Sequence, residues 1–178
     1  MRTRAERNDS PVLDATPLAT DTLRMSDDYR IEKVRHPVEI TLANGRRLSG
    51  DIFLQAHARF RAGPEEPLST LNDADPFLPL VLGTGQVLLV QKSQIAVVAT
   101  TLPEIDEAAD TGVVGMHVEL TLLDGESRSG SIFPELRVDR PRLVDFLNHT
   151  SLRFVPLFAA DQLLLVSRAH IAYASPSS

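Results

Sequence analysis

The 178-residue sequence contains no cysteine and no tryptophan, and aromatic residues make up only 5% of it. Without cysteine the chain forms no disulfide, no thiolate zinc site and no iron–sulfur cluster, and it has no cysteine nucleophile. No apolar run approaches the roughly 18 residues that a helix needs to span a bilayer. The charged start, residues 1–7, leads into no apolar stretch typical of a secretory signal. We therefore expect a cytoplasmic protein that makes no contact with a membrane.

The chain also lacks any segment with a large excess of basic residues. Eighteen Lys and Arg residues stand against 24 Asp and Glu residues, which gives a formal net charge of −6. Residues 100–115 hold four of the carboxylates and no basic residue. Because basic excess dominates nonspecific affinity for nucleic acid, the composition does not favour a nucleic-acid partner, although folding can still gather a local basic patch.

What the chain does contain is an internal repeat. Residues 38–53 and 118–133 are identical at 9 of 16 positions without a gap. Shorter matches follow in the same order in both halves, such as Phe-Leu-Pro-Leu with Phe-Val-Pro-Leu and Val-Leu-Leu-Val with Leu-Leu-Leu-Val. Duplication of a unit of about 60 residues explains this order.

The repeat divides the chain into four parts. We expect a mobile N-terminal tail over residues 1–35, a first repeat over 36–99, an acidic linker over 100–115 and a second repeat over 116–178. Met25 is a candidate natural start, and the sequence does not decide whether residues 1–24 belong to the natural product.

The start of each repeat predicts a β-hairpin. Residues 38–42 alternate between apolar and polar side chains, as a half-buried strand does. The Asn-Gly and Asp-Gly dipeptides that follow in the two repeats are typical of type I′ turns. The returning strand contains Gly50, or Gly130 in the second repeat, and a glycine there indicates a bulge or a bend where a sheet curls.

The rest of each repeat predicts one short helix and three more strands. Proline and asparagine bound the helix, over residues 67–73 in the first repeat and 141–148 in the second. In the first repeat the strands are expected over residues 77–82, 86–91 and 94–99.

The fourth strand of each repeat is apolar on both faces. Residues 87–90 and 163–166 show no alternation, so both faces require burial. We expect one face to fill the strand's own barrel and the other to pack on the sister repeat, which makes a pseudo-twofold pair. Coverage by the tail or by the linker is the alternative.

The opening hairpin is similar to a known pattern. Val-Glu-Ile-Thr-Leu-Ala-Asn-Gly-Arg-Arg-Leu-Ser-Gly-Asp-Ile, residues 38–52, resembles the first motif of Sm-like proteins, and residues 87–98 resemble their second motif. The chain also resembles an uncharacterised bacterial family of duplicated barrels. The resemblance implies an all-β fold of two tandem SH3-like (Sm-like) barrels, each with one short helix between its second and third strands.

The sequence departs from the Sm-like pattern where those proteins bind RNA. They use an Asp–Asn pair and an Arg-Gly pair, whereas residues 91–94 read Gln-Lys-Ser-Gln and residues 167–170 read Ser-Arg-Ala-His. The resemblance therefore implies the fold, and it implies neither RNA binding nor assembly into a ring.

No constellation of residues indicates catalysis. The five histidines fall into no ligand spacing, and no nucleophile has a base and an orienting group at a recognisable distance in the sequence. These histidines are His36, His57, His117, His149 and His170. We expect no enzyme, no cofactor and no metal site.

Four residues are candidates for a ligand groove. Asn72 and Asn148 each follow a leucine at the end of the predicted helix, where the alternative is a helix C-cap in the left-handed conformation. Arg137 and Arg140 lie in the variable stretch before the second helix. Arginine there can meet a phosphate or an acidic partner, and the alternative is a solvated surface of mixed charge.

These observations favour a non-enzymatic binding or scaffolding module. We expect it to contact another protein through a sheet edge or through the groove between the repeats. A barrel that binds RNA through the arginine stretches is the alternative, and a second copy of the chain is a further candidate partner.

Overall fold

The computed structural model describes residues 32–58, 63–103, 115–134 and 142–177. Most of the expected tail and most of the expected linker lie outside these residues. The first strand begins at Lys33, three residues before the boundary expected for the first repeat.

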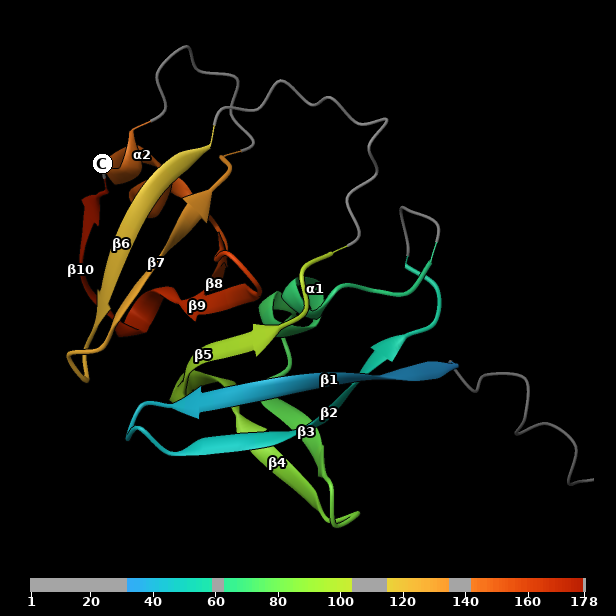
Figure 1. The fold of residues 1–178 in the computed structure, drawn as a ribbon. Helices are drawn as coiled ribbons and strands as arrows, with labels where there is room; N and C mark the ends of the chain where they lie inside the picture. The colour runs from blue at the N-terminus through green and yellow to red at the C-terminus, as the bar shows by residue number, and fades with distance from the viewer. Residues whose placement is uncertain (1–31, 59–62, 104–114, 135–141, 178) are drawn as a thin grey trace, which may run out of the picture. The chain divides into compact units, whose positions relative to one another are not determined.

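Ten strands and two short helices make up the described part of the chain, so the all-β class is confirmed (Figure 1). The first repeat contains β1 (Lys33–Leu42), β2 (Arg47–Gln55), α1 (Pro67–Asn72), β3 (Phe77–Leu82), β4 (Val87–Gln91) and β5 (Ile95–Thr100). The second contains β6 (Met116–Leu122), β7 (Ser127–Ile132), α2 (Leu143–His149), β8 (Phe154–Phe158), β9 (Leu163–Ser167) and β10 (Ile171–Pro176). A single 3-10 turn precedes the last strand of each repeat, at Lys92–Gln94 and Arg168–His170.

All pairings between these strands are antiparallel, and they form one sheet with the order β10-β6-β7-β8-β9-β5-β1-β2-β3-β4. Within each repeat the strands follow the same order, fifth, first, second, third and fourth, so the fifth and fourth strands lie at its two edges. Among the described residues the order ends at β4 and at β10. The pairings therefore form an open sheet and do not close into barrels.

The hairpin turns differ from the predicted type. A type I′ turn needs a positive φ at both central residues, but within the described part of the chain only glycines have a positive φ. In the first turn the Gly45 amide donates to the Leu42 carbonyl at 2.9 Å, and Gly45 itself has φ 78°. This is the arrangement of a type I turn followed by a bulge at a left-handed glycine.

Gly50 and Gly130 mark close approaches between strands. A Cβ atom on Gly50 would lie 2.3 Å from the carbonyl oxygen of Val81 on β3, and one on Gly130 would lie 2.6 Å from that of Phe158 on β8. The second strand of each repeat thus needs glycine where the third strand passes over its backbone.

The two repeats join through strands that are not equivalent. β5 of the first repeat pairs with β9 of the second, with Val98 opposite Leu165 and Thr100 opposite Leu163. The fifth strand of one repeat thus meets the fourth strand of the other, in a head-to-tail contact that we call the repeat joint. The expected pseudo-twofold pair is wrong, because a twofold axis would bring together equivalent strands.

The repeat joint also merges the two hydrophobic cores. Phe154, Leu163 and Leu165 of the second repeat pack in the core cluster of the first. Ala96 and Val97 of the first repeat pack in the cluster of the second. Each repeat therefore completes its core with side chains of the other.

Candidate functional site

Asn72, one of the predicted groove residues, lies at the repeat joint. Its Oδ1 atom accepts hydrogen bonds from the backbone amides of Arg153 at 2.7 Å and Phe154 at 3.0 Å. Its Nδ2 atom donates to the carbonyls of Phe154 at 3.1 Å and Leu68 at 3.0 Å. Asn72 has no positive φ, so the left-handed C-cap alternative is wrong. Asn72 thus connects α1 to the backbone at the start of β8 in the second repeat, and its place in a ligand groove stays a prediction.

Of the other three predicted residues, the structure describes only Asn148. Asn148 is exposed at the equivalent place on α2, and its side chain makes no hydrogen bond to the described residues. Arg137 and Arg140 lie outside the described residues.

Replacing Asn72 with alanine is expected to lower the free energy of unfolding by about 2 kcal/mol, because it leaves two backbone amides at the joint without an acceptor. Asn148→Ala is the matched control, and the change there is expected to stay within about 0.5 kcal/mol. Urea denaturation followed by circular dichroism measures both. Equal effects at the two positions would contradict the anchoring role of Asn72.

Three large apolar side chains of the first repeat are exposed together beside its free edge. Phe77 at the start of β3 is 50% exposed, and Val87 and Leu89 on β4 are 55% and 69% exposed. In the β3–β4 pairing Phe77 lies opposite Gln91, and Leu89 lies opposite Pro79. Pairs directly opposite one another share one face of a sheet. We call Phe77, Val87 and Leu89, together with the outer edge of β4, the β4 surface.

The counterparts of these residues in the second repeat are buried. Phe154, Leu163 and Leu165 are 2%, 9% and 0% exposed, because the first repeat covers them at the repeat joint. The expectation that the fourth strand is buried on both faces is therefore right for β9 and wrong for β4. The β4 surface has the composition of a buried joint and, among the described residues, no cover.

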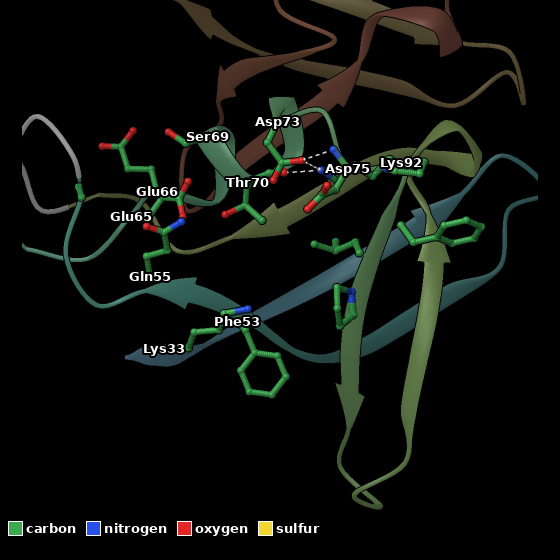
Figure 2. Close-up of a pocket in the computed structure, with 15 residues that line it drawn as sticks. Lys33, Phe53, Gln55, Glu65, Glu66, Ser69, Thr70, Asp73, Asp75 and Lys92 are labelled. Atoms are coloured by element: carbon green, nitrogen blue, oxygen red, sulfur yellow. Dashed lines mark hydrogen bonds and ion pairs between the residues drawn. The ribbon is translucent and has the colours of Figure 1, made fainter. Parts of the chain in front are cut away.

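A hollow of about 860 Å³ adjoins the β4 surface. Phe77 and Pro79 form part of its lining. Figure 2 shows polar side chains of α1, Ser69 and Thr70, along one wall, with Phe53 of β2 on another. The hollow thus has Phe77 of the β4 surface in its lining together with polar side chains of α1.

An ion pair between a buried lysine and an exposed aspartate borders this hollow. The Lys92 side chain is only 3% exposed, and its Nζ atom lies 2.6 Å from Oδ1 of Asp73 and donates to the Thr70 carbonyl at 2.5 Å. A buried ammonium needs such partners to offset its desolvation. Arg168 takes the same place in the second repeat and donates to the Thr150 carbonyl. The recurrence indicates that both cations tie the last turn of the repeat to its helix.

His36 on β1 contacts the neighbouring strand β5, and His170 of the second repeat contacts the Ser93 carbonyl of the first at 2.9 Å. Nε2 of His36 lies 2.6 Å from Oγ1 of Thr100. Burial lowers the pKa of His36, and the nearby Asp51 carboxylate opposes that shift. In the described part of the chain, no three His, Asp or Glu side chains gather in a way that could hold a metal ion. No helix among the described residues has the length and apolar character that crossing a membrane requires.

Comparison with known proteins gives no relative: no family model, no curated protein and no solved structure matches this chain significantly.

Proposed function

We propose that this protein is a non-enzymatic, cytoplasmic protein-binding module and that the β4 surface is its docking site. One observation carries the proposal. Phe77, Val87 and Leu89 are exposed beside a strand edge, although the same positions of the second repeat are fully packed. Exposed apolar side chains gathered in one patch are typical of interaction sites.

The backbone of β4 supports the same function. β4 pairs with β3 on one side, and on its other side no strand of the described residues follows. An unpaired edge can accept an added strand, with main-chain hydrogen bonds for affinity and side-chain contacts for specificity. Proteins that avoid such pairing place Lys or Pro on the edge, and the sequence of β4, Val-Leu-Leu-Val-Gln, contains neither.

We further propose that each repeat is a curled unit of the small SH3-like or Sm-like barrel type. The support is the shared strand order, the helix between the second and third strands, and the glycines at which those strands approach closely. Fold alone assigns no ligand, so the docking proposal rests on the β4 surface.

The RNA-binding alternative finds no specific support in the described residues. Two of the exposed arginines there, Arg35 and Arg47, lie 3.9 Å and 3.7 Å from the carboxylates of Asp51 and Glu39. Carboxylates among the arginines weaken the attraction for phosphate. RNA binding stays a prediction for the arginines outside the described part.

A photo-crosslinking amino acid placed at residue 89 tests the docking proposal. We expect ultraviolet light to join residue 89 to a protein partner in cells, identified by mass spectrometry. Leu123 is the matched control, because it is 64% exposed and lies in a hairpin turn away from the β4 surface. A protein joined equally from both positions, or none joined from residue 89, would contradict the proposal.

A further inference from the structure

We infer that the partner at the β4 surface is a second copy of this chain, which adds its β10 and α2 to the β4 surface of the first, head to tail. This inference rests on the proposed function and names its partner. The repeat joint inside the chain supplies the template.

The two ends of the sheet are complementary by the symmetry of the repeat. The joint pairs β5 with β9, and β5 is the fifth strand of its repeat while β9 is the fourth. β10 is the remaining fifth strand and β4 is the remaining fourth strand, and these two form the ends of the sheet. The contact that the chain makes once, between its halves, can therefore be repeated between two chains.

The register of the joint predicts the register of the new contact. Inside the chain Val97 lies opposite Val166, and Val98 lies opposite Leu165. Their counterparts place Tyr173 of one copy opposite Val90 of the other, and Ala174 opposite Leu89. In this register Leu89 takes the place of Leu165, which is 0% exposed at the joint.

The end of the sheet formed by β10, together with α2, also exposes apolar side chains. Tyr173 on β10 is 68% exposed, whereas its counterpart Val97 is 2% exposed at the joint. Val144 on α2 is 58% exposed, whereas its counterpart Leu68 packs against the core cluster of the first repeat. Both ends of the sheet thus expose apolar side chains at positions whose counterparts are buried at the repeat joint.

Asn148 is placed to repeat the anchor made by Asn72. At the joint the Asn72 side chain bonds the backbone of Phe154. The counterpart of Phe154 is Phe77 on the β4 surface, so Asn148 of one copy would meet the backbone of Phe77 of the other. Asn148 makes no hydrogen bond to the described residues of its own chain, which leaves its side chain available.

Two prolines make this contact weaker than the joint. Pro76 is the counterpart of Arg153 in the first repeat. It lacks the backbone amide with which Arg153 bonds Asn72 at the joint. Pro176 replaces Thr100 at the last position of β10 and removes at most one donor from the ladder. The remaining apolar and backbone contacts favour a reversible association that depends on concentration.

Light scattering on the purified chain tests the inference. We expect the mass to rise above 19.5 kDa as the concentration increases to about 100 μM, a range that reveals micromolar association. Leu89→Lys and Tyr173→Lys are each expected to give a monomer at every concentration, because each would bury an unpaired charge in the contact. Leu123→Lys should behave as the unmodified chain.

A mixture of the two monomeric variants gives the sharpest result. The Leu89→Lys chain keeps an intact β10, and the Tyr173→Lys chain keeps an intact β4. An equimolar mixture is therefore expected to form a dimer with one contact and to grow no further. Circular dichroism spectra like that of the unmodified chain show that the variants remain folded.

Three outcomes would overturn the inference. They are an unmodified chain that stays monomeric throughout, a mixture that remains monomeric, and a Tyr173→Lys chain that still associates, which would indicate pairing of equivalent edges. If residue 89 instead crosslinks to a different protein, the inference fails while the proposed function stands. If residue 89 crosslinks to nothing, both fail.

Discussion

Replacing Leu165 with alanine is expected to lower the free energy of unfolding by about 3 kcal/mol, whereas Leu89→Ala is expected to change it by less than about 0.5 kcal/mol. The two leucines occupy the same position of the two repeats. Leu165 is 0% exposed in the core cluster of the first repeat, and Leu89 is 69% exposed. The difference between the two changes in the free energy of unfolding therefore measures how much burial at the repeat joint stabilises the fold. Intrinsic differences between leucine and alanine affect both variants equally and cancel.

Urea denaturation of both variants at low protein concentration measures this difference, because dilution removes any contribution from association through β4. The slope of the free energy against urea should be unchanged, since neither variant alters the surface exposed on unfolding by much. If Leu165→Ala and Leu89→Ala prove equally mild, the second repeat does not pack on the first as the structure has it.

The strands were predictable from the sequence because their signals are local. Apolar runs of strand length placed β3, β4 and β5 within one residue of their observed bounds, whereas β1 begins five residues before the alternating stretch that predicted it. Even here the turn type was wrong, because Asn-Gly suits two different turns. The choice depends on the pairing register of the flanking strands, which the dipeptide does not contain.

The contact between the repeats was not predictable from the sequence. The two repeats have similar sequences, but in the folded chain they have different neighbours. Residues 87–90 and 163–166 have almost the same sequence, so the same burial was expected for both. In a head-to-tail contact, only one fourth strand meets a fifth strand of the same chain. Burial at these positions is therefore decided by their place in the chain, which side-chain composition does not report.

The candidate site was also predictable only in part. The sequence singled out Asn72 as a candidate for a ligand groove, because asparagine at the end of a helix offers both a donor and an acceptor. That role stays a prediction. Only the fold shows that the Asn72 side chain accepts hydrogen bonds from the backbone amides of Arg153 and Phe154. The sequence predicted that Val87 and Leu89 are covered. The structure leaves both side chains exposed among the described residues, and most of the tail and linker, the alternative covers, lies outside the part it describes.

The second large effect is expected at Gly50, where alanine should lower the free energy of unfolding by about 3 kcal/mol or more. The added Cβ would lie 2.3 Å from the backbone oxygen of Val81, and a backbone atom cannot turn aside as a side chain can. β3 would have to move away from β2, which weakens the pairing of Gly50 with Leu82. In a chain of this size the loss corresponds to a melting temperature lower by roughly 10 °C.

Gly83→Ala is the matched control for this prediction. Gly83 has no heavy atom within 4 Å of an added Cβ, and its φ is not in the left-handed region. Alanine there is expected to be neutral or slightly stabilising, because it restricts the unfolded chain. Gly130→Ala should match Gly50→Ala, since the Phe158 oxygen lies 2.6 Å from its added Cβ. A mild effect at Gly50 and Gly130, measured by thermal unfolding, would mean that the third strand of each repeat does not cross the second as closely as the structure shows.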